Sequence, residues 1–81
     1  MAKLPAKTLE VLATKAINNA IEGDWDALSE FELIAYDIRP YITVELDAYL
    51  ADKVEEYGTE REALRDYNEL VETLKEFNLV S

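Results

Sequence analysis

Acidic side chains are the residues of this sequence whose types and spacing come closest to a chemical site. The chain of 81 residues contains 18 Asp and Glu residues, but no His and no Cys. It therefore lacks an imidazole base, a thiolate nucleophile and the ligands of the common zinc and iron–sulfur sites. Neighbouring carboxylates such as Asp24 and Asp26, or Glu55 and Glu56, would work as an acid–base pair only if burial raised the pKa of one of them. Nothing in the sequence indicates that burial.

Other features also argue against an enzyme or a metal site. The segment 24–26 (Asp-Trp-Asp) begins like a calcium loop, but Leu28 occupies a ligand position, and the glycine and the final Glu of such a loop are missing. Neither serine stands in a Gly-x-Ser-x-Gly motif, and the two glycines are isolated, so no phosphate-binding loop is present. We therefore expect no catalytic residue, no metal, no cofactor and no enzymatic activity.

The composition is typical of one small, soluble, strongly acidic domain. Lys and Arg number 8 against 18 acidic residues, which gives a net charge of −10, and 49% of the residues are hydrophobic. This apolar content is too high for a disordered acidic tail. No apolar run approaches the roughly 18 residues of a membrane span, and no signal-peptide pattern opens the chain. We expect a single domain over residues 1–81 that is cytoplasmic and does not contact a membrane.

The elements that carry these residues are predicted to be helices, because apolar residues recur at steps of three and four. The pattern predicts helices over 5–22, 25–38, 40–57 and 60–77, with turns at Gly23 and Gly58. Pro40 is expected to end the second helix and open the third, although 40–44 is also compatible with an extended segment. The apolar pair Leu79-Val80 is expected to pack on the bundle. The predicted fold is all-α, a small bundle of about four helices built from two helical hairpins.

The acidic residues are unevenly distributed and fall opposite the apolar stripes. Residues 1–22 carry a net charge of +1, whereas residues 23–81 carry 5 basic and 16 acidic residues. Carboxylates repeated at one helical turn, about 5.4 Å, approximate a row of phosphates and would suit a basic protein surface. The alternative is that the charge only keeps the protein soluble. The candidate acidic face consists of Glu62, Asp66, Glu69, Glu72 and Glu76 in 60–77, with Glu45, Asp52, Glu55 and Glu56 in 40–57.

In size and charge balance, the chain is similar to small acidic proteins that bacteriophages encode to inhibit host defence, including DNA mimics that act against restriction enzymes. This likeness is compositional. It implies a non-enzymatic binding protein that inhibits a basic protein, one that handles nucleic acid or acts in host defence. Direct binding of nucleic acid is not expected, because a net charge of −10 repels phosphate.

Residues 23–40 also resemble the turn and second helix of a tetratricopeptide repeat, with Gly-Asp-Trp at the start and Pro at the end. The signature of that repeat's first helix is missing, because Lys15 and Asn19 stand where the family has Leu and Tyr. The likeness therefore implies a helical hairpin, and it assigns no binding residues.

Several large apolar residues lie off the predicted stripes, among them Val11 and Trp25, and four of them form a group, namely Leu33, Tyr36, Tyr41 and Val44. Either the helix over 25–38 is buried on nearly all sides, or these residues form an interface, most simply that of a two-fold homodimer. The interface reading gives an alternative function, a structural or adaptor module that dimerises or binds a partner through this apolar face. Strong salt dependence of partner binding would favour the acidic face, and weak dependence the apolar one.

Overall fold

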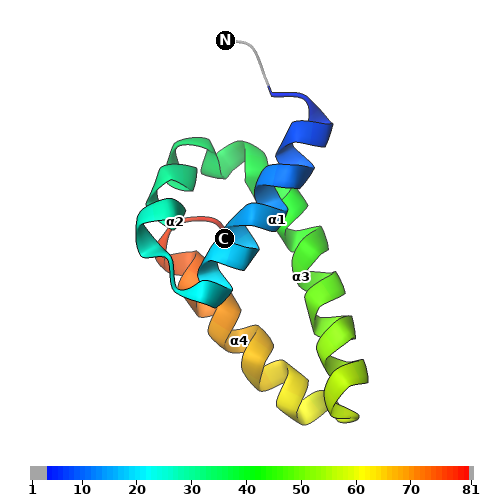
Figure 1. Ribbon diagram of the computed structural model, residues 1–81. Coiled ribbons are helices and arrows are strands. Elements are labelled where there is room, and N and C mark those ends of the chain that lie inside the picture. Colours follow the sequence, from blue (N-terminus) through cyan, green and yellow to red (C-terminus); the bar gives the residue numbers. More distant parts are fainter. Residues whose placement is uncertain (1–3, 81) are drawn as a thin grey trace.

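The computed structural model describes residues 4–80, and its regular elements are helices (Figure 1). Helix α1 spans Ala6–Glu22, α2 spans Trp25–Phe31, α3 spans Ala35–Tyr57 and α4 spans Glu60–Glu76, and a 3-10 turn, η1, covers Glu32–Ile34. No strand occurs in this part of the chain. The prediction of an all-α fold is confirmed.

Two helices end at glycines whose backbone is left-handed, as the sequence predicts. Gly23 follows α1 with φ of 79°, and Gly58 follows α3 with φ of 74°. The N–H of Gly23 donates to the carbonyl of Ala20 (3.3 Å), and that of Gly58 donates to the carbonyl of Val54 (2.9 Å). Side chains with a Cβ are strained at such φ values, which is the reason for glycine at both helix ends.

The prediction for the second helix is wrong. Instead of one helix over 25–38 that stops before Pro40, α2 ends at Phe31, and α3 begins at Ala35 and continues through Pro40. Pro40 lies in the second turn of α3, so it gives up only the hydrogen bond to the carbonyl of Tyr36, a residue that is 86% exposed. Residues 40–44 are therefore helical and not extended. The break in the chain falls at η1, where Ile34 has φ of −120° and ψ of 17°.

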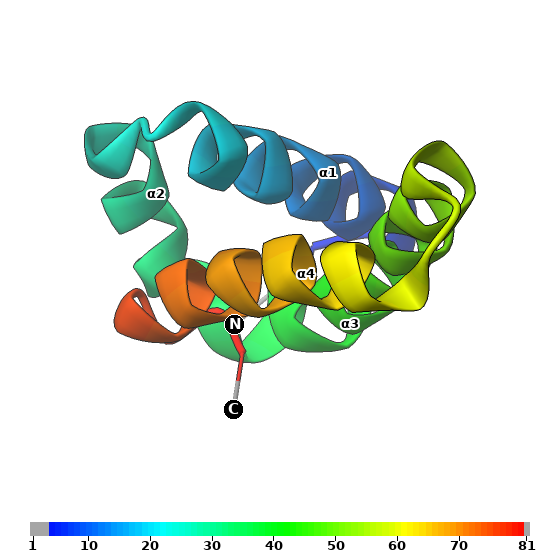
Figure 2. The ribbon, with the colours of Figure 1, turned by 90° about the horizontal axis from the view of Figure 1, so that it is seen from below.

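Helix α3 is the long element against which α1 and α4 pack (Figures 1 and 2). Helix α4 returns along α3 after the turn at Gly58, as one of the two predicted hairpins requires. Helix α1 contacts α2 after the turn at Gly23 but makes its main contact with α3, so the predicted bundle of two hairpins is matched only in part. Figure 2 shows α2 as a short bridge at one end of the molecule. The ring of Trp25 in α2 stacks on that of Phe77 beyond α4, with centroids 6.3 Å apart.

The core lies between α1, α3 and α4. Ala13 and Ala16 of α1 are completely buried, and their small side chains allow α1 to lie close to its neighbours. Burial of each large aliphatic side chain stabilises the fold by about 1.5–3 kcal/mol. The largest fully buried side chains are Leu28, Ile38, Ile42, Leu74 and Leu79.

The residues after α4 complete this core. Asn78 is left-handed with φ of 61°, and the N–H of Leu79 donates to the carbonyl of Leu74 (3.0 Å). Leu74 and Leu79 are both fully buried, as in helix ends where an apolar residue packs back on the last turn. Arg39 Nε donates to the carbonyl of Asn78 (2.9 Å), which ties this segment to α3. The predicted packing of Leu79-Val80 is confirmed.

Candidate protein-binding surfaces

The acidic residues expected to form one face lie in different surroundings. Glu62, Glu72 and Glu76 are exposed along α4, and Glu55 and Glu56 are exposed near the end of α3. By contrast, Glu45 and Asp52 line a hollow between α1 and α3, whereas Asp66 and Glu69 line a hollow bounded by α1, α3 and α4. We call the exposed set the outer acids. We call the set that lines the hollows the groove acids, and Glu10 of α1, which lines a third hollow, also belongs to it.

Most of these carboxylates have no basic partner. Among residues 4–80 there is one ion pair, in which Lys53 Nζ lies 3.3 Å from Glu56 Oε2. This hydrogen bond raises the pKa of Lys53 above its ordinary value. Arg61 and Arg65 lie beside Glu62 around a shallow hollow on α4 without forming an ion pair to it. The negative charge is therefore largely uncompensated within the described chain, and it creates a potential that attracts cations.

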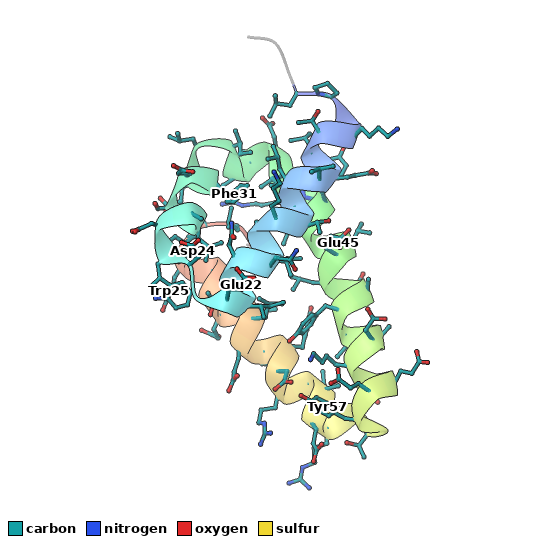
Figure 3. The ribbon with its side chains drawn as sticks, in the orientation of Figure 1. Glu22, Asp24, Trp25, Phe31, Glu45 and Tyr57 are labelled. Carbon is teal, nitrogen blue, oxygen red and sulfur yellow. The ribbon has the colours of Figure 1, made fainter. Side chains whose placement is uncertain are left out.

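Lys53 lies between two tyrosine rings of its own helix. Its Nζ is 5.6 Å from the ring centroid of Tyr49 and 5.6 Å from that of Tyr57. Tyr57, which Figure 3 places where α3 meets α4, donates a hydrogen bond to the carboxylate of Asp66. That bond raises the pKa of Tyr57, and burial raises the pKa of Tyr49. The two tyrosine rings and the carboxylate of Glu56 therefore together hold the ammonium group of Lys53.

A groove follows the contact between α1 and α3. It consists of three adjoining hollows of about 370, 180 and 350 Å³. Thr14 and Glu45 line both the first and the second hollow, and Ile21 and Tyr49 line both the second and the third. Figure 3 shows Glu45 on α3 at the edge of α1. We call this feature the α1–α3 groove; its apolar lining includes Val11, Ile21, Tyr41, Val44 and Tyr49.

The four apolar residues singled out in the sequence are divided between two places. Leu33 (90% exposed) and Tyr36 (86% exposed) project where η1 meets α3, and we call this pair the corner patch. The guanidinium of Arg39 lies 5.7 Å from the ring centroid of Tyr36. Tyr41 and Val44 line the α1–α3 groove instead. The exposure of the corner patch excludes the interpretation in which the segment 25–38 is buried on nearly all sides.

The chain was compared with protein-family models, curated proteins and solved structures. None of them matches it. The segment 23–40 does not form the continuous second helix of a tetratricopeptide repeat, because α2 ends at Phe31. Within residues 4–80, no group of three or more acidic residues is placed to hold a metal ion, and no helix there is long and apolar enough to cross a membrane.

Of the side of the groove that α1 contributes, sequence reasoning singled out Val11 alone. The helical spacing places Ile21 on the buried stripe, yet its side chain is 55% exposed, and Val11 is 54% exposed. A signal for this side is present, because Val11, Thr14, Asn18 and Ile21 recur at steps of three and four and form a second stripe beside the buried one. Which stripe faces α3 and which faces solvent is decided by how the helices cross.

Proposed function

We propose that this protein is a non-enzymatic acidic binding protein that occupies and inhibits a basic protein, one that handles nucleic acid or acts in host defence. The observation that carries the proposal is the uncompensated charge, with 18 acidic residues in the chain and one ion pair among residues 4–80. Glu62, Glu72 and Glu76 are exposed along α4. The fourteen residue-to-residue steps from Glu62 to Glu76 correspond to about 21 Å of helix.

The physical basis of this function is the one that governs binding of nucleic acid. A basic cleft attracts a row of carboxylates as it attracts phosphates, with faster association and release of the counterions held at its surface. Occupation of the cleft then excludes nucleic acid. The protein itself repels phosphate, since its net charge is −10.

A second candidate function is favoured by the corner patch. Leu33 and Tyr36 expose nearly their whole side chains, and large apolar and aromatic residues of this kind are the ones that protein interfaces bury. In this alternative the protein is a structural or adaptor module that forms a homodimer or binds a partner through these residues. Tyr41 and Val44 would then widen the contact along α3.

The two functions are separated by the salt dependence of partner binding. The immobilised protein is exposed to a bacterial lysate and washed at about 0.1 M and then about 1 M salt, where the Debye length falls from about 10 Å to about 3 Å. For the inhibitor, we expect a basic protein that elutes at high salt and that no longer binds duplex DNA when this protein is added. Retention at high salt, together with loss of capture by the variant Leu33→Asp/Tyr36→Asp, would favour the adaptor.

A further inference from the structure

The α1–α3 groove differs from the outer acids because exposed apolar side chains line it beside the carboxylates. Val11, Ile21 and Val44 are 54%, 55% and 66% exposed, although they are aliphatic and line adjoining hollows. Single exposed aliphatic residues are ordinary on a small protein. Three of them in one groove, with Tyr41 and Tyr49 beside them, form an apolar strip, although Thr14 and Asn18 also line these hollows.

Carboxylates accompany this strip over its whole length. Glu10 and Glu45 line the first hollow, Asp52 lines the second, and Asp66 and Glu69 line the third. Among the residues that line the three hollows, Lys53 is the one with a positive charge. Its ammonium group is held by Glu56 and by the rings of Tyr49 and Tyr57. A partner that covers the strip must therefore bring both apolar and positively charged side chains.

The length of the groove and the helical structure around it indicate the shape of that partner. Val11 and Ile21 are ten residues apart on α1, which corresponds to about 15 Å, or three turns of a helix. An extended peptide that adds to a sheet needs a free strand edge, and residues 4–80 contain no strand that would offer one. A helix laid in a groove needs no such edge, because its backbone hydrogen bonds are made internally.

We propose that the α1–α3 groove binds a basic amphipathic helix of the partner protein. Apolar residues spaced at i, i+3 or i+4, and i+7 of that helix pack on Val11, Val44 and Ile21. Lys and Arg residues on its flanks face the groove acids, and one of them reaches the hollow that Asp66 and Glu69 line. This inference rests on the proposed function, the binding of a basic protein, and it names the binding surface and the recognised element.

The recognised element also explains how binding would inhibit. In several classes of DNA-binding protein, a basic helix enters the major groove of DNA. Capture of such a helix in the α1–α3 groove withdraws its basic residues from nucleic acid. The outer acids then contribute attraction at longer range, and the groove supplies the specific contact.

The test uses defined peptides. The first is a fluorescein-labelled peptide of Leu and Lys, about 14 residues or four turns long, with Leu on one helical face. The second has the same composition with the Leu residues scrambled around the helix, and the third is oligolysine of equal charge. Binding is followed by fluorescence anisotropy at about 0.1 M salt, where charges are screened beyond about 10 Å. We expect the patterned peptide to bind at least about tenfold more tightly than the other two. Equal affinity for patterned and scrambled peptides would overturn the inference.

Matched variants locate the binding surface. Val11→Ala/Val44→Ala removes apolar area from the groove, and Leu33→Ala/Tyr36→Ala removes it from the corner patch; Ala favours helix, so circular dichroism should be unchanged. Glu45→Gln/Asp52→Asn removes two groove acids and Glu72→Gln/Glu76→Gln two outer acids, so both net charges become −10 + 2 = −8. We expect each groove variant to weaken the patterned peptide at least about fivefold more than its matched control. Equal losses within each pair would overturn the inference.

The failure of the groove and the failure of the proposed function give different results. If all three peptides bind with strong salt dependence and the matched variants do not differ, the protein binds basic partners by charge alone, and the groove inference is wrong. If none of the three peptides binds even at low salt, the acidic binding function is wrong as well. Loss of the patterned peptide in the Leu33→Ala/Tyr36→Ala variant alone would assign binding to the corner patch and contradict the groove.

Discussion

The hydroxyl of Tyr57 donates a hydrogen bond to the carboxylate of Asp66, across the turn that joins α3 to α4. Of the nine carboxylates considered for partner binding, Asp66 is thus engaged inside the protein, where it helps to close the α3–α4 hairpin. Its neighbours along α4, Glu62 and Glu72, are exposed and form no hydrogen bond or ion pair within residues 4–80. The acids of α4 consequently divide between a structural role and a free surface.

Stability should fall in alkaline solution because of two tyrosines, with a further contribution from Lys53, whose pKa is also raised. The hydrogen bond to Asp66 raises the pKa of Tyr57, and burial raises the pKa of Tyr49, both above the ordinary value of 10.0. Because the folded pKa is the higher one, the stabilisation is fully present below pH 10 and is lost as the pH rises through the folded pKa. We expect the free energy of unfolding in urea to be level from neutral pH to about pH 9.5 and to fall above it.

The variant Tyr57→Phe checks the cause of this effect. It should unfold at a slightly lower urea concentration at neutral pH, and its loss of stability above pH 10 should be smaller than that of the native protein. Tyrosinate absorbance should also show one late-titrating group fewer in the variant. An identical alkaline loss with and without the Tyr57 hydroxyl would contradict the role of the Asp66 hydrogen bond.

Leu79 should be essential for stability although it lies two residues from the end of the given sequence. Its side chain is fully buried against Leu74, so Leu79→Ala leaves a cavity and should cost about 2–5 kcal/mol of unfolding free energy in urea. Leu33→Ala is the control, because its side chain is 90% exposed and its removal should change stability by less than about 0.5 kcal/mol. Similar costs for the two variants would show that the last residues do not belong to the core.

Charge reversal of the outer acids tests the inhibitor function. Glu62→Lys/Glu72→Lys/Glu76→Lys changes the net charge to −10 + 6 = −4 and should abolish binding of the basic partner at low salt. The helical circular-dichroism signal should be retained, because exposed charges contribute little to stability. The control Leu33→Asp/Tyr36→Asp should bind as the native protein does. Unchanged affinity in the Lys variant with loss in the control would reject the DNA-mimic proposal.

The exposure of the corner patch leads to a separate prediction, that the protein forms a homodimer. If Leu33 and Tyr36 form a two-fold interface, sedimentation at micromolar concentration should show a dimer, because their apolar surface is then buried between two copies. Leu33→Asp/Tyr36→Asp should sediment as a monomer with unchanged helix content. A native protein that remains monomeric over the whole accessible concentration range would contradict the homodimer.

The features that the sequence predicts correctly are the ones that depend on neighbouring residues. Helices α1 and α4 and the left-handed turns at Gly23 and Gly58 follow from apolar spacing and from the conformational freedom of glycine, which act within one or two turns. The sign of the surface charge also follows from the sequence alone, because 18 acidic and 8 basic residues impose a negative potential on any compact fold of this chain.

Tertiary packing decided the break between α2 and α3 and the groove. In one straight helix Leu28 and Ile38 would lie ten residues, about 15 Å, apart, whereas the bend at η1 brings both into the same core. The burial gained there outweighs the single hydrogen bond that Pro40 gives up inside α3. Likewise, periodicity places Val11 and Ile21 at the edge of the apolar stripe of α1, but only the contact of α1 with α3 determines that both remain exposed. Local spacing defines the faces of a helix, and long-range packing selects which face is buried.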